Sequence, residues 1–134
     1  MNPISPEVLT GTIGELLVQI RLLQYGVQAA PPVKDSGNDL IAVRGNVFKA
    51  LQVKTTTTGI FAPPRSNANY HILAVVMLNG EGNQVQLDQS EVFLIPKEKV
   101  GQIPRRVSQW DKTQFGISKT IVERLFVSAR GSLG

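Results

Sequence analysis

The chain has 134 residues, no cysteine, one histidine and a formal net charge of +4. This length predicts a single domain, residues 1–134, that can bury a core without disulfides, and the composition excludes thiolate and multi-histidine zinc sites. No apolar run approaches the ~20 residues that cross a bilayer, so we expect an intracellular, cytoplasmic protein. The positive charge favours an anionic partner such as nucleic acid, although scattered basic residues are also typical of an ordinary solvated surface.

The first predicted element is a helix over residues 6–25, because Ser5 can cap it, Pro6 suits its first turn and Gly26 can end it. Apolar residues at helical spacing predict a stripe that packs on a sheet: Leu9, Ile13, Leu16, Leu17, Ile20 and Leu23. Glu15 projects away from this stripe, yet it also has apolar neighbours. It is either an ordinary surface glutamate or a carboxylate that needs a partner.

Residues 26–33 are expected to be extended, as a candidate first strand that ends at a proline pair. A turn over 34–37 follows, and its Asp35 can accept hydrogen bonds from backbone N–H groups further along the turn. Asp35 is therefore one candidate functional acid. Asp39 is preferred, because it lies inside the next predicted strand whereas turn aspartates usually only cap.

Residues 38–54 predict a β-hairpin, because two strand-like runs flank Gly45 and Asn46, which both tolerate the positive φ of a tight turn. Apolar residues occupy both faces of these runs. This pattern is typical of a central sheet that is covered on both sides, as in an α/β domain.

The pairing of this hairpin brings polar residues together at its open end. If Arg44 pairs with Val47, Asp39 stands opposite Gln52, and the two-residue period places Lys54 on the same face as Gln52. An acid, an amide and an amine then converge on an otherwise apolar face. The alternative is an exposed ion pair at the strand ends, which contributes only ~0–1 kcal/mol.

A long loop, residues 55–69, follows the hairpin directly, and loops of this length are commonly functional. The hydroxyls of Thr55 and Thr56 and the guanidinium of Arg65 are candidates to contact DNA phosphates. Phe61 is expected to pack beneath the loop.

The rest of the chain predicts further strands and helices. Expected are a buried strand over 70–78, short strands over 84–87 and 91–95, a short helix from 96–100, a helix over 118–127 and a flexible tail over 131–134. Arg105 and Arg106 are candidate DNA contacts beside Trp110. In the alternative reading, their segment is a solvated connector with Trp110 in the core. His71 is expected to be structural or to contact phosphate.

The order and spacing of the polar residues on the first helix and the hairpin resemble those of the PD-(D/E)xK, or restriction-endonuclease-like, nuclease superfamily. The matching features are Gly14 and Glu15 on the first helix, Asp39 on a strand, and Gln52 and Lys54 as a Gln-x-Lys variant of the family's Glu-x-Lys. Replacing the second acid by glutamine removes a charge. The resemblance implies an α/β fold with a mixed central sheet flanked by helices, in the αβββαβ order.

The resemblance also implies the chemistry of the site. Asp39, the side-chain oxygen of Gln52, the Val53 carbonyl and Glu15 would hold Mg²⁺, with Mn²⁺ as a possible substitute, and Lys54 would orient or deprotonate the attacking water. The expected activity is that of a metal-dependent DNA endonuclease, acting as a homo-oligomer; homing, restriction, resolvase and repair roles fit equally. The alternative is a catalytically silent DNA-binding or protein-interaction module on the same fold.

Overall fold

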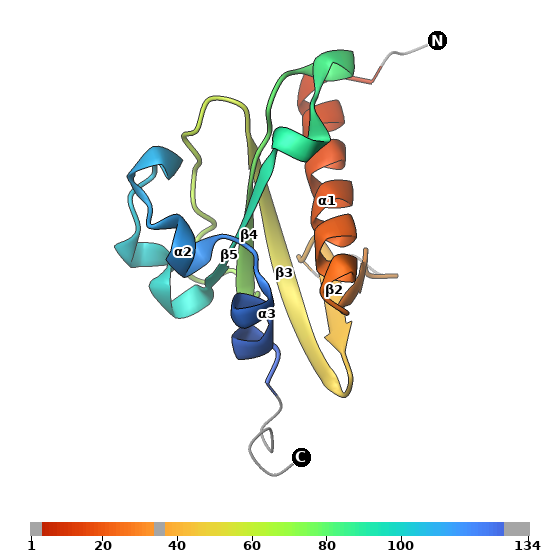
Figure 1. The fold of residues 1–134 in the computed structure, drawn as a ribbon, viewed down its shortest axis with the longest axis vertical. Coiled ribbons are helices and arrows are strands. Elements are labelled where there is room, and N and C mark those ends of the chain that lie inside the picture. Colours follow the sequence, from red (N-terminus) through yellow and green to blue (C-terminus); the bar gives the residue numbers. More distant parts are fainter. Residues whose placement is uncertain (1–3, 34–36, 128–134) are drawn as a thin grey trace.

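The computed structural model describes residues 4–33 and 37–127, and Figure 1 shows a mixed sheet at its centre. The strands are β1 (Gln28–Ala30), β2 (Leu40–Arg44), β3 (Val47–Thr56), β4 (Ile72–Met77) and β5 (Glu91–Pro96). They lie in the order β1-β2-β3-β4-β5, with β3 and β4 parallel and the other neighbours antiparallel. The predicted α/β fold with a mixed central sheet is confirmed, but the αβββαβ order is wrong, because a loop over 57–71 rather than a helix joins β3 to β4. Asp35 and the predicted tail over 131–134 lie outside the described residues.

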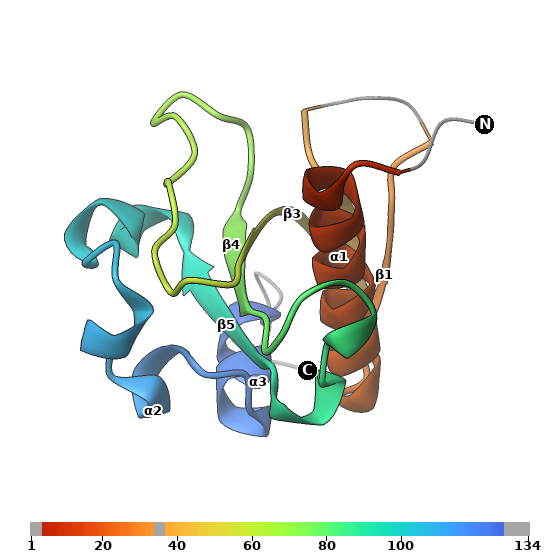
Figure 2. The same ribbon diagram turned by 90° about the horizontal axis from the view of Figure 1, so that it is seen from above.

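The predicted hairpin forms in the expected register, with Arg44 paired to Val47 and Gly45 at a φ of +61° in the turn. β2 pairs with β3 only as far as Leu51, whereas β3 continues to Thr56 and pairs there with β4. The last residues of β3 therefore have no strand neighbour on their β2 side. The connection to β4 begins after Thr56, two residues later than predicted, and Figure 2 shows it projecting from the sheet.

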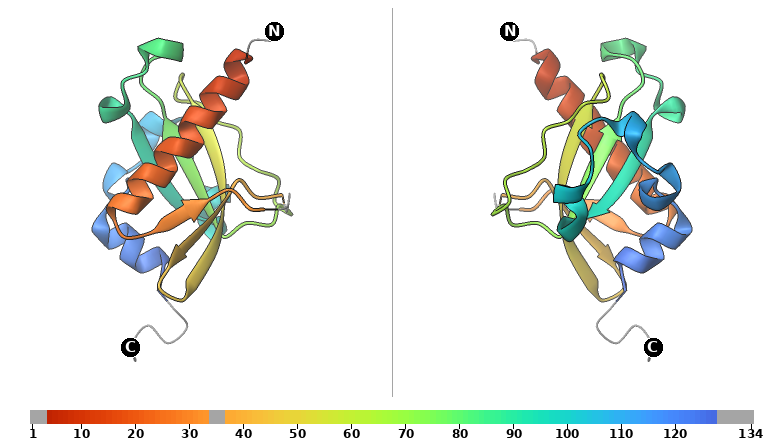
Figure 3. Two further views of the ribbon diagram at one scale, coloured as in Figure 1. Left: turned by 90° about the vertical axis from the view of Figure 1, so that its right-hand side faces the viewer. Right: turned by 90° about the vertical axis from the view of Figure 1, so that its left-hand side faces the viewer.

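The helix α1 (Pro6–Gln24) has the predicted cap, because the Ser5 hydroxyl accepts the Val8 N–H at 3.2 Å. It crosses one face of the sheet diagonally (Figure 3). The predicted stripe is wrong at Leu16, Ile20 and Leu23, which are half or more exposed. The buried residues of this helix are Gly14, Leu17, Val18 and Leu22.

The reason for this rotation is a close approach of α1 to β3. A Cβ atom on Gly14 would lie 1.8 Å from the Thr55 hydroxyl oxygen, so only glycine fits there. The helix therefore turns its glycine face, rather than its bulkiest apolar stripe, to the sheet.

Two hydrophobic clusters cover the two faces of the sheet. α1 shares one cluster with α3 (Lys119–Leu125), whose cap forms as predicted when Ser118 accepts the Ile121 N–H at 3.2 Å. On the other face, Trp110 makes edge contacts with Phe61, Phe93 and Phe115 at ring distances of 5.2–6.2 Å. The core alternative for Trp110 is thus confirmed. The short helix α2 (Lys112–Phe115) belongs to this second layer.

The predicted strand over 84–87 is wrong. The segment instead carries two 3-10 turns, η1 (Gly82–Gln84) and η2 (Leu87–Gln89). Gly80, at a φ of +91°, allows the chain to fold back so tightly that a Cβ there would lie 2.4 Å from the Gln84 carbonyl oxygen. The short helix expected from 96–100 forms as the 3-10 segment η3 (Lys97–Gln102), and η4 (Val107–Gln109) follows it. Across the described ranges, no helix combines the length and the apolar content needed to cross a membrane.

Candidate active site

Asp39 directly precedes β2, next to the part of β3 that pairs with β4 but has no strand neighbour on its other side. Its backbone N–H donates to the Leu51 carbonyl at 3.0 Å. Its carboxylate oxygen Oδ2 accepts the Val53 N–H at 2.7 Å and the Gln52 Nε2–H at 3.1 Å. The predicted meeting of Asp39 and Gln52 is therefore confirmed, and it occurs through donated hydrogen bonds.

The backbone of Val53 also faces this site. In an extended strand, the N–H and the C=O of one residue point to the same neighbour. Because the Val53 N–H reaches Asp39, its carbonyl also points to the open side of β3. The carbonyl oxygen is thus placed as a ligand would require.

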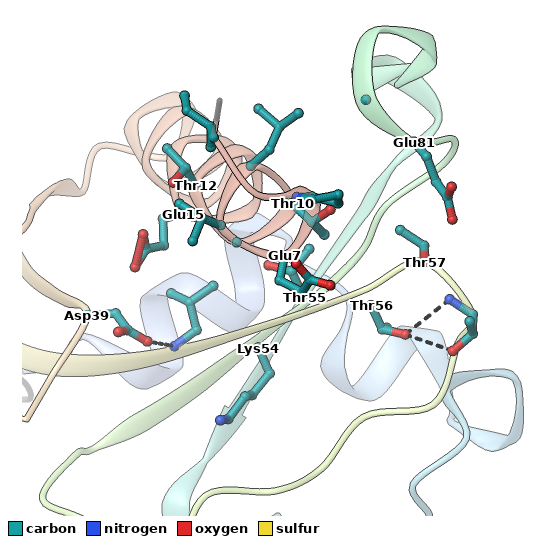
Figure 4. A pocket seen from close by; sticks show the side chains of 18 residues that line it. Glu7, Thr10, Thr12, Glu15, Asp39, Lys54, Thr55, Thr56, Thr57 and Glu81 are labelled. Atoms are coloured by element: carbon teal, nitrogen blue, oxygen red, sulfur yellow. Dashed lines mark hydrogen bonds between the residues drawn. The ribbon is translucent and has the colours of Figure 1, made fainter. Parts of the chain in front are cut away.

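Glu15 approaches from α1, and the contact of Gly14 with Thr55 sets the height of the helix above β3. Glu15 is partly buried, and its pKa is raised, first by burial and then by the negative charge of Asp39. Both carboxylates line one pocket of about 970 Å³, and Figure 4 shows them side by side. Two carboxylates in such proximity are stabilised by a cation between them.

Lys54 lines the same pocket, but its ammonium does not join the carboxylates. In Figure 4 the side chain leaves β3 on the side opposite to Glu15, with its nitrogen turned away. The alternation of a strand explains this direction, because Thr55 faces α1 and its neighbour Lys54 must face the other way. The structure therefore brings Glu15 and Asp39 together in the pocket and joins Gln52 to Asp39, while the Lys54 ammonium stays apart.

The two threonines predicted to contact DNA belong to the strand rather than to the loop. Thr55 packs against Gly14 of α1. Thr56 is buried, and its hydroxyl accepts the N–H groups of Thr58 and Gly59 at 3.2 and 3.0 Å. The assignment of Thr56 to DNA is therefore wrong, since its hydroxyl anchors the start of the loop.

The three candidate arginines are exposed and lie outside the pocket. The segments that carry them are joined, because the Phe61 N–H donates to the Arg105 carbonyl at 3.1 Å and Ile60 forms a bridge with Arg106. Arg65 extends from the same loop four residues later. The backbone segments that carry Arg105 and Arg106 are therefore joined to the start of the loop that carries Arg65.

His71 has a structural contact, since its Nδ1 accepts the Ala50 backbone N–H at 2.9 Å. This bond closes the start of the β3–β4 pair.

Sequence reasoning missed two further carboxylates of the pocket, those of Glu7 and Glu81, and Figure 4 shows Glu81 pointing toward Thr57. Glu81 precedes η1 and falls between the two strands predicted over 70–78 and 84–87, so no sequence signal placed it here. The pocket lining contains four carboxylates and one lysine.

The residues present fit a hard divalent cation. Within 4–33 and 37–127, no three His, Asp or Glu side chains are grouped to hold a metal by themselves. A cation here would rely on Asp39 and Glu15 together with the Val53 carbonyl, and water would complete its coordination. Such an all-oxygen set with retained water suits Mg²⁺.

Comparison with known proteins finds a likeness of structure but not of sequence. No protein-family model and no curated protein matches the sequence. The structure is similar to that of a bacterial homing endonuclease, I-Ssp6803I, with a TM-score of 0.59 over 87% of this chain and 92% of that chain, at 14% sequence identity. The likeness shows that the two chains share a fold.

Proposed function

We propose that this protein is a metal-dependent DNA endonuclease that hydrolyses phosphodiester bonds. The observation that carries the proposal is the Glu15–Asp39 carboxylate pair at the open end of β3, next to Gln52 and Lys54. The fold shared with a homing endonuclease supports it. DNA as the substrate also implies that the protein works inside the cell.

Each residue of the site has a separate proposed role in the reaction. Asp39, Glu15 and the Val53 carbonyl would hold Mg²⁺, or Mn²⁺ in its place, and the bound cation supplies charge neutralisation at the phosphate and an activated water. Lys54 lines the same pocket, so a change of its side-chain rotamer, with DNA bound, brings its ammonium to the attacking water. Counted by themselves, Asp39, Glu15 and Lys54 carry one net negative charge, which a divalent cation bound between the two acids converts to a local positive charge that attracts phosphate.

DNA affinity is proposed to come from outside the pocket. The pocket is net negative without a cation and therefore repels phosphates. Arg65, Arg105 and Arg106 are exposed, and among the described residues Lys112–Glu91 forms the one salt bridge, so these arginines are not neutralised by an ion pair. They are the proposed phosphate contacts that hold the duplex against the site.

A homo-oligomer is the proposed assembly, formed through the exposed face of α1. Leu16, Ile20 and Leu23 stand one helical turn apart and are 52, 50 and 61% exposed. They border a groove of about 580 Å³ with β1 and β2 that no charged side chain lines. On a chain of net charge +4, such a neutral apolar face lets two copies meet with little repulsion.

A catalytically silent DNA-binding or protein-interaction module on the same fold is the second candidate. Two observations favour it: glutamine replaces the second acid at position 52, and the Lys54 ammonium is turned from the carboxylates.

The substitution Lys54→Ala separates the two candidates. With Mg²⁺, the enzyme is expected to nick at least one of supercoiled, linear, branched and mismatched DNA, and Lys54→Ala should lose ~10²-fold or more in rate with DNA binding retained. Lys49→Ala, on the same strand but outside the pocket, is the control and should cleave normally. Absence of cleavage of every substrate with Mg²⁺ and Mn²⁺, alongside DNA binding, would support the module.

A further inference from the structure

Gln52 makes a contact that a metal ligand would not need. A carboxylate only accepts hydrogen bonds, so the side-chain nitrogen of Gln52, not its oxygen, faces Asp39. This nitrogen and the Val53 N–H donate to the same atom, Oδ2, at 3.1 and 2.7 Å. One oxygen of Asp39 is therefore held by two donors, and the other, Oδ1, is the oxygen left to a cation.

We propose that Gln52 is a positioning residue that fixes the Asp39 carboxylate through its donated N–H, and that it is not a metal ligand. The proposal rests on the proposed function, because it assigns Gln52 a role in that site. It also explains the amide at this position: a glutamate has no proton to donate at neutral pH, and it would place a second negative charge against Oδ2.

The fixed carboxylate matters for rate because a group that must bind a cation in one geometry loses less entropy if it is held beforehand. The backbone donor from Val53 alone leaves the carboxylate free to turn about its own axis. The second donor from Gln52 restricts this rotation and so limits the directions that Oδ1 can take.

Three substitutions separate donation from ligation. Gln52→His keeps an N–H donor at a similar reach and removes the oxygen; Gln52→Glu keeps an oxygen and removes the donor; Gln52→Met removes both. If Gln52 positions Asp39, the histidine variant should nick DNA within about threefold of the wild-type rate at a pH above the pKa of its ring, as measured by the ring proton resonances, and the other two should lose about tenfold or more. If Gln52 is a ligand, the glutamate variant should retain the wild-type rate and the histidine variant should lose it, which would overturn the proposal.

A second readout needs neither metal nor activity. In nuclear magnetic resonance spectra of the metal-free protein, the Val53 amide proton should resonate downfield and exchange slowly, because a held carboxylate accepts it. Both signatures should persist in Gln52→His and weaken in Gln52→Met and Gln52→Glu. A Val53 amide that is unchanged in all three variants would show that Gln52 does not hold Asp39.

The cleavage assay and the magnetic resonance measurement together distinguish a failure of the proposed function from a failure of the role assigned to Gln52. If the wild-type protein cleaves no DNA, the proposed function fails, and the Val53 amide still reports on the positioning of Asp39. If the protein cleaves DNA and the glutamate variant matches it, the proposed function stands and the role of Gln52 is refuted. Thermal unfolding of each variant identifies any that has lost the fold. If Gln52→Met has lost it, Gln52→Asn, whose amide is too short to reach Asp39, takes its place; the Val53 amide of the remaining variants tests the positioning in any case.

Discussion

Glu15 destabilises the metal-free protein at neutral pH, because burial and the charge of Asp39 both raise its pKa. The unfolded chain loses the Glu15 proton near its ordinary value of 4.5, while the folded protein holds it to a higher pH. The contribution of Glu15 to stability is therefore greatest below pH 4.5 and falls as the pH rises through the folded pKa.

Glu15→Gln should accordingly raise the free energy of unfolding at pH 7 and flatten its decline above pH 4.5, as measured by urea unfolding across this range. Mg²⁺ should then stabilise the wild-type protein more than the variant. Glu123→Gln, at an exposed position on α3, is the control and should change neither property. A Glu15→Gln protein that is less stable at pH 7 would contradict the assigned cause.

For individual residues, the sequence predicted the contacts that depend on backbone register better than those that depend on long side chains. The two-residue period and one turn sufficed to bring Asp39 to Gln52, because hairpin register is set locally. The direction of the Lys54 ammonium depends on several side-chain torsions, and Thr56 was assigned to DNA because its burial could not be read from a threonine run.

The contact between α1 and β3 controls how closely Glu15 approaches Asp39. Gly14→Ala would force the helix and Thr55 apart, since the new Cβ would lie 2.9 Å from the Thr55 Cβ even if the hydroxyl turned away. Overpacking of this kind costs ~1–3 kcal/mol, which exceeds or offsets the ~1 kcal/mol gain in helix propensity. The variant should be no more stable than the wild type and should cleave more slowly.

Gly11→Ala is the matched control, because nothing lies within 4 Å of its added Cβ. This variant should be stabilised by ~1 kcal/mol in chemical unfolding, with cleavage unchanged. Equal stabilisation by both alanines would show that Gly14 is not needed for the helix to approach the strand.

Helices and strands with strong local signals were predictable, but the face that α1 turns to the sheet was not. The cap at Ser5, the hairpin turn at Gly45 and the buried strand β4 all formed as expected. For α1, apolar residues occupy more than one face, so periodicity alone could not identify the face that Gly14 turns to the sheet. The 84–87 segment holds only two apolar residues, and the backward turn at Gly80 outweighed its weak strand pattern.

The exposed face of α1 predicts the behaviour of the whole molecule in solution. Ile20→Glu should place a charge in the centre of the proposed contact and shift the protein to monomer at concentrations where the wild type is a dimer or larger, as measured by sedimentation equilibrium. Leu87→Glu, at an apolar residue of similar exposure elsewhere, should leave the mass unchanged. A wild-type protein that stays monomeric at every concentration would refute the assembly.

The two-sided core followed from the sequence because apolar runs predicted β3 and β4 to be buried on both faces. The order of the strands beyond the β2–β3 hairpin was not predicted, since it depends on the tertiary fold. The acidic lining of the pocket did not follow, since Glu7 and Glu81 are 74 residues apart in the sequence and line one pocket only because of the tertiary fold. This lining makes DNA cleavage depend on a cation to a degree that net charge alone would not suggest.

The nicking of supercoiled plasmid by wild-type protein and by Asp39→Asn, measured across a Mg²⁺ titration with EDTA reversal, tests the central claim most directly. The site described here predicts cleavage that rises with Mg²⁺, stops on chelation and falls by ~10²-fold or more in Asp39→Asn, because the substitution removes the negative charge that the cation needs. Nicking that persists in EDTA, or that proceeds equally in both proteins, would contradict it.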